Sequence, residues 1–133
     1  MADQHDLADL LLGLAADDDA ALRAMVDVPA VTDGIVGFHA QQAVEKALKS
    51  VLAARGVDFP FDHDLRVVMD LCDSAGCPVP SHISDAQRLT PYAVHQRYGT
   101  SDAGDVTRAE AATWAAEAIA WARPLAEESR PRN

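Results

Sequence analysis

The stretch that most constrains this chain is residues 38–49, Phe-His-Ala-Gln-Gln-Ala-Val-Glu-Lys-Ala-Leu-Lys, where apolar and polar residues follow helical spacing. Residues three or four positions apart share one face of a helix. One predicted face is narrow, so another helix can approach it closely: Ala40, Ala43, Ala47 and Val51. A second face carries a ring, an amide, a carboxylate and an ammonium: Phe38, Gln42, Glu45 or Lys46, and Lys49. A purely structural helix needs only Leu or Ala there, so these groups are functional candidates.

The composition favours helices that pack through small side chains. Of the 133 residues, 49% are apolar but only 5% are aromatic, and alanine supplies much of the apolar share. Alanine is the strongest helix former, whereas sheets favour Val, Ile and aromatic residues. We therefore expect an all-α chain with one domain over residues 1–133, a core at 4–126 and a frayed tail at 127–133.

The helix signals predict an antiparallel up-and-down bundle of four or five helices. The first apolar stripe begins at Leu7 and resumes from Ala21, with three consecutive Asp residues at 17–19 between the two parts. One long helix can carry this triplet as a solvated acidic patch, which is the interpretation we favour. Alternatively, the triplet caps a second helix that begins near Ala20.

The later helices are marked by capping residues before an apolar stripe and by glycine after it. A capping box, in which two side chains each accept from the other's backbone N–H, marks the start of the last helix. One helix is predicted to begin at Thr32 or Asp33 and to stop at Gly56, and the next to begin at His63-Asp64 and to stop at Gly76. A short helical piece is predicted after Ser81 or Ser84. Thr107 and Glu110 form the capping box of an Ala-rich helix.

The net charge limits the partners of the chain. It is -10 with a pI of about 4.6, so the average field repels nucleic acid and anionic membranes, and any RNA contact must be local. The sequence has no basic region before an apolar run and no long apolar segment, so we expect a cytoplasmic protein that does not enter a membrane. Cys72 and Cys77 lack the spacing of a zinc site, so we expect two buried thiols, no metal and no cofactor.

The order of the motifs along the chain resembles a known family. Residues 38–49 come first, and His63-Asp64-Leu65 follows a Phe-Pro loop. Leu89-Thr90-Pro91-Tyr92-Ala93 comes next, then Arg97-Tyr98 and an Ala-rich helix. This order is similar to that of the HEPN family (higher eukaryotes and prokaryotes nucleotide-binding domain) in its small stand-alone prokaryotic form. The resemblance covers roughly residues 4–126, and its first motif is specific because twelve consecutive positions agree in type.

The resemblance implies a helical bundle that dimerises, that is commonly encoded beside a minimal nucleotidyltransferase, and that in several branches is the toxin of a toxin–antitoxin pair. Many HEPN proteins are metal-independent ribonucleases in which a His moves a proton and a nearby Arg stabilises phosphate charge. Arg88 and His95, with six intervening residues, are the matching pair here. Leu follows Arg88 where catalytic members carry a polar residue, and Pro91 disturbs the helix, so a solvated Arg and His are the alternative.

The nucleotide- or RNA-binding candidates are the polar residues of the matched motifs: His39, Gln42, Glu45, Lys46, His63, Asp64, Tyr92, Arg97 and Tyr98. Each also has a structural interpretation. Glu45 can pair with Lys49 at the surface, whereas a buried Lys46 would need Asp64, another carboxylate or a bound phosphate. His63-Asp64 can simply begin a helix, and the two tyrosines with Arg97 can serve packing and capping as well as base stacking.

Three functional hypotheses follow from the sequence. The chain is a dimeric nucleotide- or RNA-interacting component of a nucleotidyltransferase-paired, toxin–antitoxin-like system, or a metal-independent ribonuclease toxin that uses Arg88 and His95, or a structural bundle without a ligand. The faces of the helix at 38–49 discriminate between binding and structure. A cleft that Gln42, Glu45 and Lys46 share with His63, Tyr92 and Arg97 favours binding, whereas open solvent at these positions favours a structural role.

Overall fold

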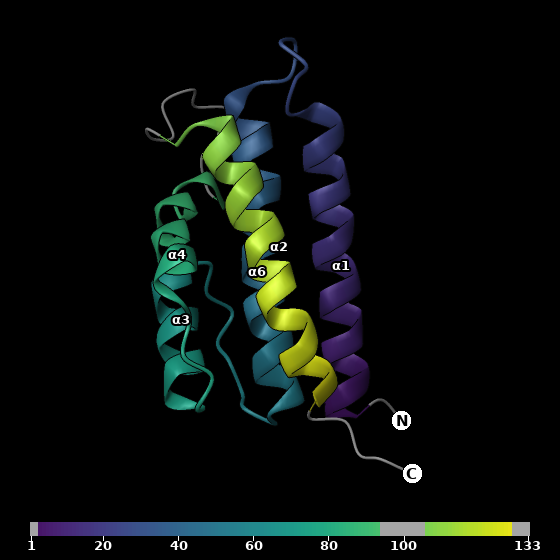
Figure 1. Cartoon of the computed structure of the whole chain (residues 1–133), viewed down its shortest axis with the longest axis vertical. Helices are drawn as coiled ribbons and strands as arrows, with labels where there is room; N and C mark the ends of the chain where they lie inside the picture. Colours follow the sequence, from purple (N-terminus) through teal and green to yellow (C-terminus); the bar gives the residue numbers. More distant parts are fainter. Residues whose placement is uncertain (1–2, 94–105, 129–133) are drawn as a thin grey trace.

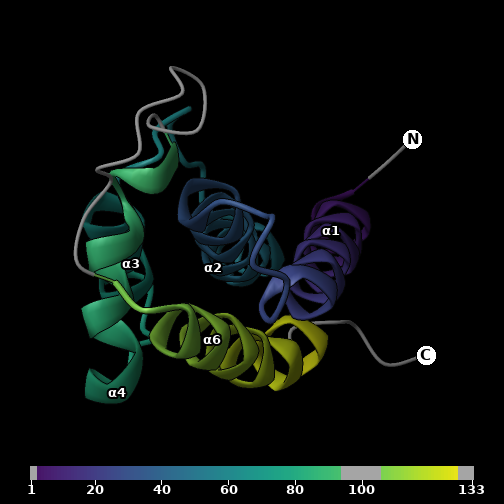
Figure 2. The same ribbon diagram turned by 90° about the horizontal axis from the view of Figure 1, so that it is seen from above.

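Helix α2 (Asp33–Ala54) is the centre of the fold, because its small residues let other helices pack on several sides. Its N-cap is Thr32, whose Oγ1 accepts a hydrogen bond from the backbone N–H of Ile35 at 3.3 Å. Gly56 follows its end with a φ of 69°, the left-handed conformation that glycine adopts at low cost. Sixteen of its 22 residues are buried, and Figure 2 shows it between α1, α3 and α6.

The computed structural model describes residues 3–93 and 106–128 (Figure 1). Besides α2, its elements are α1 (Gln4–Met25), α3 (Leu65–Ser74), α4 (Ser81–Ser84), the 3₁₀ helix η1 (Asp85–Leu89) and α6 (Arg108–Glu128). All of them are helical, which confirms the predicted all-α helical bundle. Among the described residues, no helix combines the length and the apolar character that crossing a membrane requires.

The directions of the helices depend on one extended connection. Helix α1 runs antiparallel to α2, whereas α3 and α6 run in the same direction as α2 (Figure 1). The connection after Gly56 returns along α2, so that the backbone oxygen of His63 accepts a hydrogen bond from Gln41 at 3.1 Å. Helix α3 then begins near the middle of α2, and its Cys72 donates to the backbone oxygen of Leu48 at 3.7 Å. His63 of this connection is thereby placed against α2.

The predicted capping box of the last helix is confirmed. The backbone N–H of Glu110 donates to Thr107 Oγ1 at 3.1 Å, and the backbone N–H of Thr107 donates to Glu110 Oε1 at 3.0 Å. The second bond is the largest cause that holds the pKa of Glu110 below its ordinary value. Trp114 and Ala118 lie on the buried face of this helix, as its apolar stripe predicts.

Helix α1 is continuous, as favoured, but the expectation of a solvated acidic patch is wrong for two of the three Asp residues. Asp17 is exposed, whereas Asp19 is only 7% exposed and the Asp18 side chain is 13% exposed. Asp19 occupies the buried face of α1 and forms an ion pair with Arg23 at 2.9 Å. Asp18 faces α2, where it has two partners described below.

The start of α2 is packed against the chain that follows η1. A Cβ atom at Gly37 would lie 2.0 Å from Cδ1 of Tyr92. Non-bonded carbon atoms pack at about 3.5–4.0 Å, so no side chain fits at this position in the present structure. The Tyr92 ring is itself buried. Only glycine therefore allows this contact between the two segments.

Arg108, the first residue of α6, binds the loop that joins α1 to α2. Its Nε donates to Asp33 Oδ1 at 2.7 Å. Its two terminal nitrogens donate to the backbone oxygens of Met25, the last residue of α1, and of Val26, Val28 and Val31 in the loop. A single guanidinium thus satisfies carbonyl groups at and after the end of α1.

Cys72 and Cys77 are both free and buried, as predicted. Burial raises the pKa of Cys72 to about 12, and the thiolate is the reactive form. At pH 8 only about one Cys72 in ten thousand is then ionised. We expect no reaction with Ellman's reagent within minutes in buffer and release of two equivalents of chromophore after guanidinium is added. Rapid release from the folded protein would contradict this burial.

Candidate functional site

The central group of the site is the carboxylate of Glu45, which is buried in the middle of α2. Its side chain is 6% exposed. Oε1 accepts hydrogen bonds from His63 Nδ1 at 2.8 Å and from Gln41 Nε2 at 3.0 Å, and Oε2 accepts from Lys49 Nζ at 3.0 Å. A buried carboxylate is costly without partners, and three donors supply them here. Glu45 is therefore a fixed acceptor on which other side chains are oriented.

His63 connects this buried carboxylate to solvent. Its side chain is 53% exposed, although its Nδ1 is bound to Glu45. Because the carboxylate accepts from Nδ1, it orients the imidazole ring and leaves the other ring nitrogen on the outer side. The next residue, Asp64, is the N-cap of α3 and accepts from the backbone N–H of Arg66 at 3.0 Å, as predicted for a helix start. The helix start and Glu45 together hold the ring in place.

Gln41, which the sequence interpretation did not select, joins the parts of the site. It is fully buried. Its Nε2 donates to Glu45 and to the backbone oxygen of His63, and its Oε1 accepts from Gln42 Nε2 at 2.6 Å. The position of Gln41 four residues before Glu45, one helical turn away, was the available signal. Gln42 is half-buried, so its amide extends the network toward the surface.

A second cluster lies beside the first, between α1 and α2. Asp18 of α1 accepts from Lys46 Nζ at 2.7 Å and is paired with His39 Nδ1 at 3.0 Å. The side chains of Lys46 and His39 are 24% and 28% exposed. Lys46 thus has a carboxylate partner, one of the alternatives that the sequence left open. We use the name polar face of α2 for the two clusters together: Asp18, His39, Gln41, Gln42, Glu45, Lys46, Lys49 and His63.

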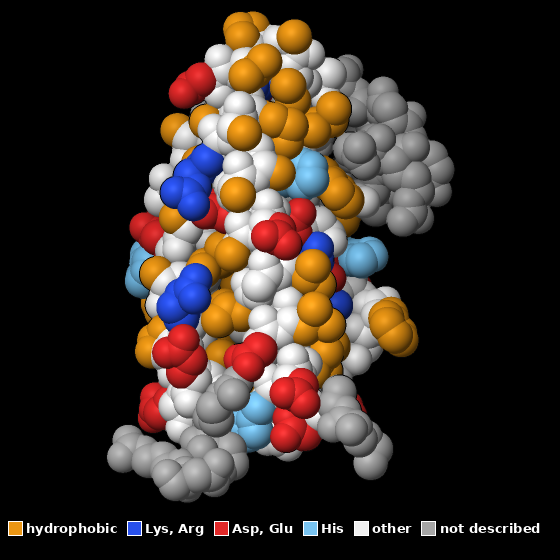
Figure 3. Space-filling view, turned by 90° about the vertical axis from the view of Figure 1, so that its right-hand side faces the viewer, with side chains coloured by type: hydrophobic (Ala, Val, Ile, Leu, Met, Phe, Trp, Pro, Cys, Tyr) orange, Lys and Arg blue, Asp and Glu red, His pale blue; other side chains and the backbone are white. Residues whose placement is uncertain are grey.

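Charges on the polar face of α2 are balanced. Two carboxylates, Asp18 and Glu45, oppose two ammonium groups, Lys46 and Lys49, and two imidazoles can add positive charge when they are protonated. On the side of the molecule that α1 presents, charged side chains of both signs lie among hydrophobic ones (Figure 3). The local charge of the site is therefore far less negative than the net charge of the chain suggests. A local contact with an anion is electrostatically feasible there.

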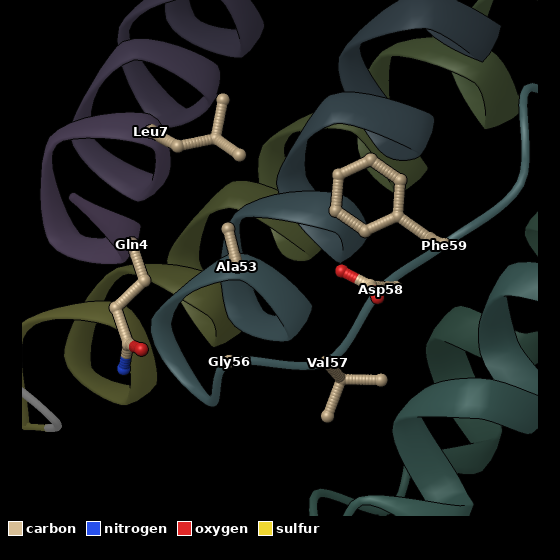
Figure 4. A pocket seen from close by; sticks show the side chains of 7 residues that line it. All are labelled: Gln4, Leu7, Ala53, Gly56, Val57, Asp58 and Phe59. Carbon is tan, nitrogen blue, oxygen red and sulfur yellow. The ribbon is translucent and has the colours of Figure 1, made fainter. Parts of the chain in front are cut away.

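A pocket of about 370 Å³ lies near the Lys49 end of this face (Figure 4). Its lining comes from the start of α1, the end of α2 and the connection that follows: Gln4, Leu7, Ala53, Gly56, Val57, Asp58 and Phe59. Phe59 links the pocket to the polar network, because Lys49 Nζ lies 5.4 Å from the centroid of its ring. This is the distance range of a cation–π interaction.

The other predicted site residues are not brought to the polar face by any described contact. Arg88 lies on η1, where it pairs with Glu110 at 3.3 Å and lies 5.5 Å from the ring of Trp114. Tyr92 is buried against Gly37, as described above. The predictions for His95, Arg97 and Tyr98 fall outside the described residues. The pairing of Arg88 with His95 consequently stays a prediction.

The donor set of the site does not match a metal centre. Among the described residues, no group of three or more His, Cys, Asp or Glu side chains is placed to hold a metal ion. In the polar face of α2 the carboxylates are occupied by ammonium, amide and imidazole groups instead. Gln42, Lys46 and the two His residues are partly exposed, so they are available for hydrogen bonding and charge pairing.

Comparison with known proteins identifies the family of the chain. The model of the HEPN domain matches residues 34–123, which include all of the polar face except Asp18. No curated protein and no solved structure gives a significant match. The matched segment covers well over half of the 133 residues. The chain therefore belongs to the HEPN domain family.

Proposed function

We propose that this protein is a dimeric nucleotide- or RNA-interacting component of a nucleotidyltransferase-paired, toxin–antitoxin-like system, and that the ligand binds along the polar face of α2. HEPN is a nucleotide- and RNA-related family. The observation that carries the proposal is the hydrogen-bonded series of polar side chains on a helix that is otherwise buried by apolar contacts. A helix with only a structural role has no need of this series.

The roles of the side chains follow from their exposure and their partners. Lys46 and His39 share Asp18, so they can turn part of their hydrogen-bonding capacity toward a phosphate group. His63 and the amide of Gln42 can contact a sugar or base edge. Glu45, Lys49 and Gln41 are too buried to touch a ligand, and they support the exposed groups instead. A phosphate has to compete with Asp18 for Lys46. Salt screens the charge of the phosphate, so binding should weaken as salt is added.

Replacing Lys46 with methionine is expected to weaken nucleotide or RNA binding about 10-fold or more, because a charge-assisted hydrogen bond is lost. Titration calorimetry with ATP, GTP and a short single-stranded RNA measures this in a buffer that contains chelator. Arg123→Met is the matched control, since it removes an exposed positive charge from α6. Equal weakening by both substitutions would mean that binding is unspecific and would contradict the site.

The nucleotidyltransferase partner is tested separately. The reading frame beside the gene is co-expressed with a tagged copy of this chain, and the complex is sought by affinity purification. Recovery of a nucleotidyltransferase in a fixed ratio supports the paired system. If the neighbouring frame encodes no such enzyme, or the two proteins do not associate, the partner part of the proposal is wrong.

A further inference from the structure

Phe61 has a large apolar side chain that the fold does not bury. It lies on the connection between Gly56 and Asp64, and its side chain is fully exposed. Phe59, two residues earlier, packs against the hydrophobic core. Phenylalanine buries about 150–250 Å² when it is enclosed. A single exposed apolar residue is common on protein surfaces, so Phe61 alone is not evidence of an interface.

The pocket near Lys49 is a candidate site for a ring such as that of Phe61. Four of its lining residues are apolar: Leu7, Ala53, Val57 and Phe59. In Figure 4 the side chains of Leu7 and Phe59 stand on opposite sides of Ala53. An apolar cavity of about 150 Å³ is sufficient to bind benzene. The pocket, at about 370 Å³, is therefore large enough for a phenyl ring, and the fully exposed ring of the same chain does not occupy it.

The short distance between ring and pocket determines what kind of assembly they allow. Phe61 is two residues from Phe59, so their Cα atoms are at most about 7 Å apart. In a two-fold symmetric dimer the same patch of both copies meets, and each contact occurs twice. A ring and a pocket in one patch can be exchanged reciprocally across such an axis. An assembly of this kind closes at two copies, whereas a distant ring and pocket would favour an open filament.

A stripe on α1 extends the apolar surface beyond the pocket. Leu7, which lines the pocket, is 41% exposed, and Leu10 and Leu14 follow at i+3 and i+7 with 58% and 38%. Two inserted rings and the pocket walls that they cover would supply roughly 800 Å² of buried surface. A standard interface needs about 1,600 Å². The leucine stripes of both copies are positioned to contribute to the remainder.

We propose that a second copy of this chain docks on this surface, with Phe61 of each copy inserted into the pocket of the other. The inference rests on the dimer that is part of the proposed function, and it identifies the surface that forms it. His63 follows Phe61 by two residues, so docking brings the polar faces of both copies beside the two-fold axis. Both copies carry a charge of -10, and salt screens their repulsion. Dimer affinity should therefore rise with salt, whereas nucleotide or RNA binding falls.

Sedimentation equilibrium of the full chain at several concentrations and two salt concentrations tests the docking surface. The variants are Phe61→Ser for the inserted ring and Leu7→Gln for the pocket wall. Val28→Ser is the matched control, because Val28 is an exposed apolar residue on the loop between α1 and α2. Circular dichroism confirms that each variant is folded. We expect a wild-type dimer, a dissociation constant at least 100-fold higher for Phe61→Ser, an increase of about 10-fold for Leu7→Gln, and no change for Val28→Ser.

A photo-crosslink tests the position of the ring directly. With p-benzoylphenylalanine in place of Phe61, the crosslinked peptide should contain residues 4–7 or 53–59 of the second copy. Crosslinks that map elsewhere, or a Phe61→Ser protein that dimerises as tightly as wild type, overturn the docking surface but leave the proposed function intact. A wild-type monomer at 100 µM overturns both this inference and the dimer in the proposed function. Calorimetry with nucleotides then decides separately whether the polar face binds a ligand.

Discussion

The Gly37→Ala protein is expected to be about 2–4 kcal/mol less stable than wild type, although the substitution adds only one methyl group. The new Cβ would lie 2.0 Å from Cδ1, 2.4 Å from Cε1 and 2.6 Å from Cγ of Tyr92. Overpacking of this kind typically costs about 1–3 kcal/mol and occasionally more. The upper part of the range applies because the clash involves a buried ring. The melting temperature should fall by roughly 10 °C.

Urea denaturation and two companion proteins test this interpretation. Gly13 is the control, because it also lies within a long helix but a Cβ added there has no atom within 4 Å. Gly13→Ala should stabilise the protein by about 0.5–1 kcal/mol through helix propensity alone. In a Tyr92→Ala background, the cost of Gly37→Ala should largely disappear. If Gly37→Ala costs as much without the Tyr92 ring as with it, the close contact is not the cause.

The second large effect is expected at Glu45. Glu45→Leu should lower the free energy of unfolding by about 3–5 kcal/mol, because it leaves the ammonium of Lys49 buried without its carboxylate. The Lys49 side chain is 8% exposed, so water cannot easily replace the lost partner. His63 and Gln41 also lose their acceptor. Removing the exposed ring in His63→Ala should cost much less, which makes it a useful comparison.

The double variant Glu45→Leu/Lys49→Leu distinguishes a charge effect from a packing effect. Replacement of a complete buried ion pair by apolar side chains is often neutral or stabilising. We expect the double variant to recover to within about 1 kcal/mol of wild type, with the comparison made by urea denaturation at pH 7. A double variant that is as unstable as the sum of its single substitutions would show that Glu45 and Lys49 act independently.

Local sequence signals predicted the helices well. The capping box at Thr107 and Glu110, the N-cap of α2 and the glycine after its end depend on residues within a few positions of one another. The small-residue face of α2 is likewise buried because helical spacing is regular: Ala40, Ala43, Ala47 and Val51. These features are independent of how distant segments meet, and for that reason the all-α bundle could be predicted.

The candidate site depends on distant segments, and its partners were predicted only in part. Asp18 meets Lys46 only because α1 has one particular axial position along α2, and an acidic triplet in isolation favours solvent. His63 meets Glu45 because the extended connection returns along α2, which no periodic pattern shows. Gln41 was missed because a buried amide cannot be told from its half-buried neighbour Gln42 in sequence. The family resemblance selected residues on α2 and His63 as candidates, but it did not indicate which side chains pair with one another.

Arg108 has a consequence for the order in which the protein forms during synthesis. The groups that it binds precede it by 75 to 83 positions along the chain. At about 5–20 residues per second, a ribosome needs on the order of 4–16 s to add that length. During this time α1 and α2 can pair, but their connecting loop lacks the hydrogen bonds that Arg108 later donates. The first loop of the protein is completed by the first residue of its last helix.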